Sequence, residues 1–240
     1  MIACVRWLRA RVGDLLVHVV WRTLVAGPAL KVLVGQPVVE GSTDAARFQR
    51  AHIQRLLLSG WQRYQVLAQD LPKEPSISGT VSVLAAAMLF ALMQVLVASG
   101  LDRAYAARLV GEISWVAYQQ SFGKAGPSVL RRVAPDPLKR VRLAMHIGLR
   151  YQFTEPSYRH RRVPVAGGDG FDMLRCPIAD YLAPRGASDL CMTAFCAVDY
   201  RVFELVGMRL ERSGTISSGA ELCDFRAFPV HSKSPPRTRS

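Results

Sequence analysis

Four cysteines in the second half of the chain are the residues best suited to chemistry. They are Cys176, Cys191, Cys196 and Cys223, and fourteen, four and twenty-six residues separate them in turn. Thiolates bind zinc well and the inner spacing is within the range of zinc sites, but the outer spacings match no standard zinc finger or ribbon. A cysteine can also act as a nucleophile, or fill a core as a small hydrophobic residue. The pattern is therefore compatible with a metal site, a catalytic centre or a structural core.

Asp199 lies three residues after Cys196. On a helix over 189–206, residues three apart share a face. The pair could then serve as nucleophile and base, or as a metal ligand and its supporting acid. Cys191 and Cys196 are five apart and would lie about 140° from each other around an α-helix. That separation argues against these two thiols acting together.

The stretch CDFRAF near the end of the chain combines a thiol, an acid and a base. If it is a strand, successive side chains face opposite sides. Cys223 and Phe225 then face one side, while Asp224 and Arg226 face the other. We expect Cys223 to belong to the core or to a thiolate site, and the charged pair to lie on a different surface.

The first half of the chain has the pattern of helices that would support these residues. Apolar positions are scattered through residues 1–35, and Gly27-Pro28 is expected to break that run. Thr43 or Asp44 is a candidate cap for a helix that continues to about Leu71.

Two further helices are expected at about 80–99 and 102–121, joined at Gly100. The first of them is uncharged from Val81 to Gly100, which is about the length of a membrane span. Its alanines and polar side chains favour a buried core helix, although a membrane span stays open. The segment 123–140 is rich in glycine, proline and basic residues, and we predict a linker there.

The second half has the pattern of strands and one long helix. Residues 141–153 alternate apolar and polar side chains, which predicts a half-buried strand. A hairpin turn is expected at 166–170, followed by a strand at about 170–175. Pro177 is expected to start a helix, and a longer helix should run over 189–206 and end at Gly207. Strands are expected at 208–213 and at the last cysteine, and a disordered tail at 231–240.

These elements predict an α+β fold, with a helical N-terminal half followed by a small antiparallel sheet and one or two packed helices. We divide the chain into a helical region at 1–122, the linker at 123–140, a cysteine-containing α+β region at 141–230 and the tail.

The amino-acid composition indicates which binding partners and which cellular compartment to expect. Half of the residues are hydrophobic and the formal net charge is +13, but no nucleic-acid-binding motif is present. We therefore expect no specific nucleic-acid partner and favour a small carboxylate-bearing ligand, with contact to an anionic membrane surface left open. The five cysteines are odd in number and widely spaced, which favours a reducing, cytoplasmic setting over a disulfide scaffold. The first residues do not have the pattern of a signal peptide.

The cysteine-containing segment resembles the L-2-amino-thiazoline-4-carboxylic acid hydrolase family. The shared features are a Cys-Pro pair, a Cys-x4-Cys-x2-Asp stretch, an Arg-x2-Thr stretch, a glycine and a final Cys-Asp-Phe-Arg. The matching positions in this chain are Cys176-Pro177, Cys191, Cys196, Asp199, Arg212, Thr215, Gly219 and Cys223-Asp224-Phe225-Arg226. The ordered match covers about residues 170–228, and the helical half matches only in outline.

The resemblance implies a hydrolase that opens the ring of 2-amino-thiazoline-4-carboxylate, or of a related cyclic amidine, to N-carbamoyl-cysteine, on a bacterial route to L-cysteine. It implies four catalytic candidates, Cys196, Asp199, Cys223 and Asp224. Either acid would be the base, and a cysteine would attack the ring or bind metal.

The resemblance further implies that Arg212, Thr215 and Arg226 bind the substrate, with an arginine holding its carboxylate. Cys176 and Cys191, with Cys196 and Cys223, would hold a zinc or other divalent metal ion if one is bound. The alternative is a non-catalytic small-molecule-binding or sensing domain of the 4-vinyl-reductase type, also with a cysteine-bound zinc. The oligomeric state is left open.

Overall fold

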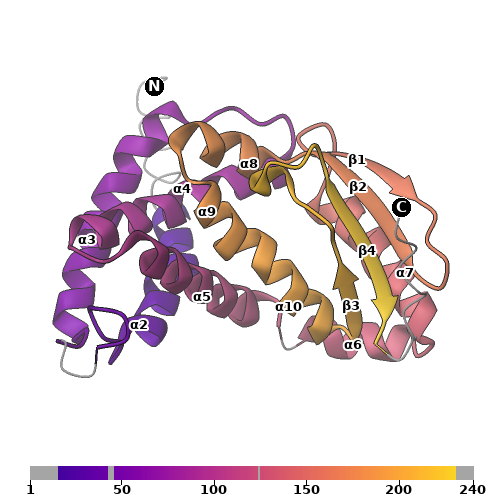
Figure 1. Ribbon diagram of the computed structural model, residues 1–240, viewed down its shortest axis with the longest axis horizontal. Coiled ribbons are helices and arrows are strands. Elements are labelled where there is room, and N and C mark those ends of the chain that lie inside the picture. Colours follow the sequence, from indigo (N-terminus) through magenta and orange to yellow (C-terminus); the bar gives the residue numbers. More distant parts are fainter. Residues whose placement is uncertain (1–15, 43–45, 124, 231–240) are drawn as a thin grey trace, which may run out of the picture.

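The computed structural model describes residues 16–42, 46–123 and 125–230, which form a helical half joined to a small sheet (Figure 1). The helical half begins with a helix over Leu16–Leu33, whose second part is α2 (Gly27–Leu33). It continues with α3 (Arg50–Leu67), α4 (Ile77–Ala98) and α5 (Arg103–Ser121). Ser76 and Asp102 cap α4 and α5 by accepting the backbone N–H of Gly79 and of Tyr105. The two helices expected on either side of Gly100 are therefore present.

The start of the helical half differs from the expectation. Gly27-Pro28 does not break the first helix, because a π-helical turn at Arg22–Ala26 precedes it and Pro28 sits in the first turn of α2, where its missing N–H is tolerated. Helix α3 begins at Arg50, and the candidate caps Thr43 and Asp44 lie outside the described residues.

Helix α4 lies in the core of the helical half, in contact with α3, α5 and α8 (Pro177–Leu182). Among the described residues, the helices Leu16–Leu33 and Ile77–Ala98 are long and apolar enough to cross a membrane by length and composition alone. The 18-residue window in α4 is 56% buried in the fold, which fits a core helix.

The segments predicted as a linker and as a strand are helical. Helix α6 occupies Ala125–Val133, α7 occupies Pro137–Ile147, and a π-helical turn continues to Gln152. Asp136 caps α7 by accepting the N–H of Lys139 at 2.7 Å. The predicted strand at 141–153 is therefore wrong, because a capped start and a proline in the first turn favour a helix there.

Within the residues that the structure describes, the sheet has four antiparallel strands in the order β1-β2-β4-β3. They are β1 (Arg159–Val163), β2 (Asp169–Arg175), β3 (Met208–Glu211) and β4 (Cys223–Pro229). The expected strands at 170–175, 208–213 and the last cysteine are confirmed, whereas β1 falls in a segment for which the sequence predicted no strand. The inner face of the sheet packs on α7, and Phe171 stacks on Phe225 with ring centroids 4.5 Å apart.

One long helix runs between the helical half and the sheet (Figure 1). It consists of α9 (Ser188–Cys191), a π-helical turn at Met192–Cys196 and α10 (Ala197–Leu205), and Gly207 follows its end with a positive φ. The π-helical turn contacts α5 and α10 contacts β3, so this helix connects the two halves. The predicted α+β fold is confirmed.

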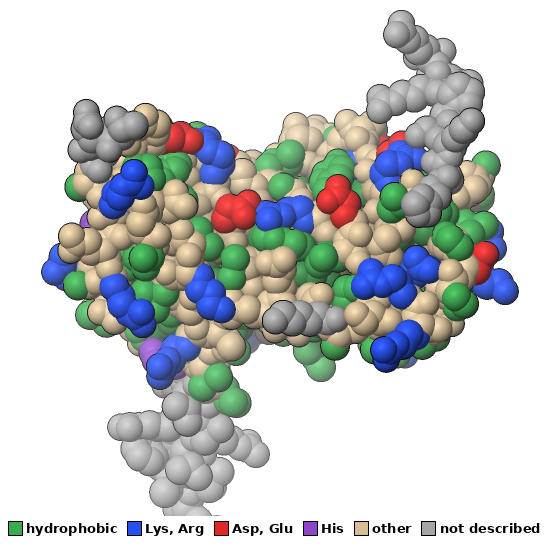
Figure 2. Space-filling view, turned by 90° about the horizontal axis from the view of Figure 1, so that it is seen from below, with side chains coloured by type: hydrophobic (Ala, Val, Ile, Leu, Met, Phe, Trp, Pro, Cys, Tyr) green, Lys and Arg blue, Asp and Glu red, His purple; other side chains and the backbone are tan. Residues whose placement is uncertain are grey.

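Charged side chains are scattered over one face of the molecule. On the face shown in Figure 2, Lys and Arg side chains lie in separate small groups, with acidic side chains among them. The predicted tail at 231–240 and Cys4 lie outside the described residues.

Candidate functional site

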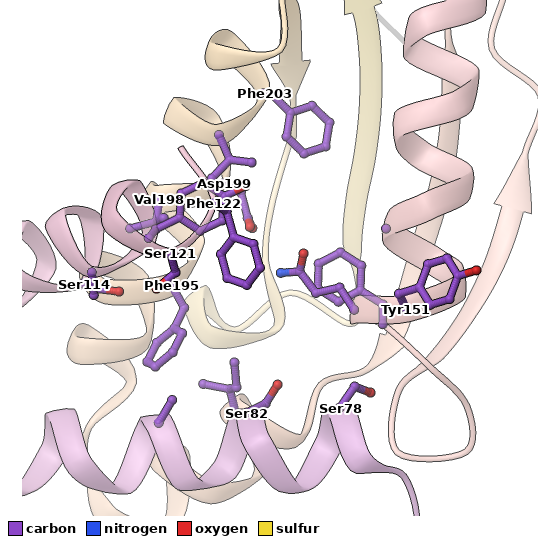
Figure 3. A pocket seen from close by; sticks show the side chains of 18 of the residues that line it. Ser78, Ser82, Ser114, Ser121, Phe122, Tyr151, Phe195, Val198, Asp199 and Phe203 are labelled. Carbon is purple, nitrogen blue, oxygen red and sulfur yellow. The ribbon is translucent and has the colours of Figure 1, made fainter. Parts of the chain in front are cut away.

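A cleft of about 1780 Å³ opens between α4, the long helix over 188–205 and the inner face of the sheet. In Figure 3, Ser78 and Ser82 point into it from α4, opposite Asp199 and Phe203 of α10. Six of the candidate residues line this cleft: Cys176, Cys191, Cys196, Asp199, Arg212 and Cys223. Asp199 is the only carboxylate among the described residues of the lining. The structure therefore gathers most of the residues that the sequence pattern indicated.

The π-helical turn brings Cys191 and Cys196 together. The N–H of Ala197 bonds to the carbonyl of Met192, five residues back, which adds one residue to the turn. Residues five apart then lie nearly above each other, and the thiol of Cys191 hydrogen-bonds to Cys196. The two cysteines are therefore close together, and the expectation that they lie apart is wrong because this part of the helix is not a regular α-helix.

The two thiols of this pair differ in their surroundings. The hydrogen bond from Cys191 lowers the pKa of Cys196, and the charge of Arg212 adds to that effect against the opposing effects of burial and of Asp199. The same hydrogen bond and burial raise the pKa of Cys191, which is fully buried while Cys196 is half-buried. Cys196 is thus the thiol of the pair that is suited to be a thiolate.

Asp199 and Arg212 form an ion pair beside Cys196. Their closest atoms are 3.0 Å apart, and Arg212 also donates to the carbonyl of Cys196. The guanidinium lies 4.6 Å from the ring centroid of Tyr200 and 4.8 Å from that of Phe225, with its side chain only 2% exposed. Burial raises the pKa of Asp199 to about 6, although Arg212 opposes the rise. This carboxyl group can therefore both donate and accept a proton near neutral pH.

The other two cysteines of the cleft are neutral thiols. Burial raises the pKa of Cys176 to about 12 and that of Cys223 to about 11. Cys223 also accepts the backbone N–H of Ile216 at 3.2 Å. Thr215 does not line the cleft but caps the short turn before Gly219, and its hydroxyl lies 3.0 Å from the sulfur of Met192. These residues shape and support the site.

Asp224 and Arg226 lie on the opposite face of the sheet, as the strand alternation predicted. Asp224 accepts the N–H groups of Ser213 and Gly214 at about 3 Å. Arg226 pairs with Asp172 at 2.6 Å. Neither side chain reaches the cleft, so the structure does not bring them together with Cys196.

Comparison with known proteins gives one family match. The model of the family described as L-2-amino-thiazoline-4-carboxylic acid hydrolase matches residues 83–227, more than half of the chain. The chain belongs to this family. No curated protein matches the chain.

The family match extends well beyond the cysteine-containing segment. It includes most of α4, all of α5 and the whole sheet up to Ala227. Both sides of the cleft are therefore part of this hydrolase family's domain, and the residues on α4 and α5 belong to the same unit as the cysteines.

A metal ion does not fit the four cysteines as they are arranged. No group of three or more His, Cys, Asp or Glu side chains within the described residues is placed to hold one. We therefore derive no chemical step through a metal ion for this hydrolase-family chain.

Aromatic residues of the first half complete the cleft, and the sequence analysis missed them. Tyr118 of α5 and Phe122, the residue directly after α5, line it. Burial raises the pKa of Tyr118, and the charge of Asp199 adds to that rise. Trp115, Tyr118 and Phe122 recur at helical spacing, with neighbouring ring centroids about 6 Å apart. That spacing was the available signal, since it places three rings along one helix face.

Proposed function

We propose that this chain opens the ring of 2-amino-thiazoline-4-carboxylate, or of a related cyclic amidine, by hydrolysis to N-carbamoyl-cysteine or its counterpart. The observation that carries the proposal is the meeting of Cys196, Asp199 and Arg212 at one place in the cleft. A lowered thiol pKa and a raised carboxyl pKa within one cleft are typical of catalytic sites.

In the first step, the thiolate of Cys196 attacks the amidine carbon of the ring. The bond from that carbon to the ring sulfur breaks, and protonated Asp199 gives its proton to the departing sulfur. The enzyme then carries the opened substrate as an isothiourea on Cys196, and the new thiol is free. Covalent catalysis of this kind replaces one difficult step by two easier ones.

In the second step, the carboxylate of Asp199 takes a proton from water as the water oxygen attacks the same carbon. The bond to Cys196 breaks and its thiolate is restored, while the product rearranges to a urea. One water is consumed overall and Asp199 ends protonated, ready for the next cycle. A pKa of about 6 suits a group that must both give and take a proton.

Arg212 is a positioning residue in this scheme. Its donors already contact Asp199, the carbonyl of Cys196 and the hydroxyl of Tyr200. It therefore fixes the acid against the helix that carries the nucleophile, and it is not free to hold a substrate carboxylate with its whole guanidinium.

The test measures release of free thiol from 2-amino-thiazoline-4-carboxylate. Cys196→Ala should reduce turnover to background, and Asp199→Asn should reduce it by about 10²- to 10⁴-fold. Intact-protein mass spectrometry should detect the isothiourea on the wild type but not on Cys196→Ala. Cys4→Ala removes a thiol outside the described residues and is the matched control. Full turnover by folded Cys196→Ala would contradict the mechanism.

The size of the cleft favours a second candidate, a domain that binds a small molecule without converting it. Such a protein would be stabilised by its ligand but would release no thiol. The same thiol assay therefore separates the two candidates.

A further inference from the structure

The cleft is much larger than the ring of the proposed substrate. Its volume of about 1780 Å³ exceeds the ~300–1,000 Å³ that is usual for pockets that take drug-sized ligands. A single small ring with an amino and a carboxylate group would occupy only the part next to Cys196. Most of the space would then lack a ligand.

One wall of the cleft is a long apolar stripe on α4. On α4 the lining runs from Ile77 through Val81 and Ala85 to Leu89, which spans about 18 Å of helix. The polar side chains in this stripe already have partners, because the hydroxyl of Tyr158 donates to that of Ser82 at 2.7 Å and Ser78 bonds to Thr154. The stripe therefore offers apolar contact to a ligand and few free hydrogen-bonding groups.

The stripe reaches the surface at an apolar rim. Five large side chains of the lining are exposed there: Ile77, Val81, Phe122, Ile147 and Tyr151. Ile77 is 86% exposed and Tyr151 is 71% exposed. Figure 3 shows Phe122 and Tyr151 beside the open space of the cleft. Single exposed apolar residues are common, but several around one opening indicate a ligand-binding groove.

We propose that the natural substrate carries a long apolar chain, such as an acyl chain, on its hydrolysable head group. The head group lies at Cys196 and Asp199, and the chain follows the stripe on α4 towards the rim. This inference rests on the proposed function for the identity of the head group, whereas the chain-binding part of the cleft is independent of turnover.

The test uses straight-chain saturated fatty acids from octanoate to palmitate as probes, with binding measured by isothermal titration calorimetry. Each added methylene buried in the stripe should tighten binding by about fourfold until the chain reaches the rim. Affinity that does not change with chain length overturns the inference.

Two variants and one control locate the binding. Ala85→Phe narrows the stripe and should weaken palmitate binding at least about tenfold, and Val81→Asn at the exposed rim should weaken it in a protein that folds normally. Ala104→Phe makes the same change as Ala85→Phe on the exposed side of α5, outside the cleft, and should leave binding unchanged. Unchanged palmitate binding in both cleft variants overturns the inference.

The thiol-release assay is run in parallel on the same proteins. If chain-length-dependent binding is found but no thiol is released, the ring-opening proposal fails and the chain-binding cleft stands. If thiol is released but fatty acids do not bind in a length-dependent way, the ring-opening proposal stands and this inference fails.

Discussion

Replacing Asp199 by asparagine should change how the stability of the protein depends on pH. Burial raises the pKa of Asp199 from its ordinary 3.8 to about 6, so the folded state binds this proton more tightly than the unfolded state does. The resulting stabilisation is present at low pH and is lost as the pH rises through about 6. A shift of about two units corresponds to about 3 kcal/mol, and the 23% exposure of the side chain reduces our expectation to about 2 kcal/mol.

The assay is urea unfolding of the wild type and Asp199→Asn between about pH 4.5 and about pH 7.5. About half of the full effect falls within this range, so the free energy of unfolding of the wild type, relative to the variant, should fall by about 1 kcal/mol across it. Subtracting the variant removes the contributions of all other titrating groups. A relative stability that rises with pH would refute the reasoning, because it would mean that the pair with Arg212 outweighs burial.

Asp224→Asn is the matched control. Partial burial alone would raise the pKa of Asp224, but the N–H groups of Ser213 and Gly214 and the Ser213 hydroxyl hold it below its ordinary value. Its stabilising effect is therefore present above about pH 4 and is lost only as the pH falls further. Across the measured range, the difference between wild type and Asp224→Asn should stay constant.

Three further changes test the packing around the cleft and the ion pairs on the outer face of the sheet. A Cβ at Gly111 would lie 2.8 Å from the carbonyl oxygen of Thr193 in the π-helical turn, so Gly111→Ala should destabilise the fold by about 1–3 kcal/mol in urea unfolding and slow thiol release. Gly126→Ala has open space and should instead stabilise by up to about 1 kcal/mol; equal effects of the two changes would contradict this account. Asp172→Ala removes the partner of two arginines on the outer face of the sheet and should cost about 2 kcal/mol without changing thiol release per folded molecule. Loss of thiol release in folded Asp172→Ala would mean that the outer face takes part in the chemistry.

The sequence predicted those elements whose ends carry a local signal. Gly100 separates α4 from α5, Pro177 begins α8, and Gly207 ends the long helix. The alternation in the last strand correctly placed Cys223 and Asp224 on opposite faces. These signals act within a few residues, so the sequence alone carries them.

The prediction failed at 141–153 because that segment satisfies two periods at once. Its alternation fits a strand, but Val141, Met145 and Leu149 are also four apart, and these three are the residues buried against the sheet. Other apolar members of the alternation, such as Ile147 and Tyr151, are exposed. Tertiary packing decided between the two patterns, and the cap at Asp136 with the proline that follows it gave the local sign of a helix.

The prediction for Cys191 and Cys196 failed for a different physical reason. Whether Cys191 and Cys196 meet depends on one extra residue in a helical turn, and nothing in their spacing indicates a π-helical turn. The neighbouring helix provides a cause, because Gly111 has no side chain and allows α5 to approach the backbone of Thr193 in that turn. The same turn leaves the carbonyl oxygen of Cys196 available to Arg212, which follows β3. Arg212 donates a hydrogen bond to that oxygen and so connects the turn to the sheet. The chemistry of the thiol pair thus depends on a contact between two helices that lie about eighty residues apart in the sequence. A substitution in that contact should therefore change both the stability of the fold and the activity of the site.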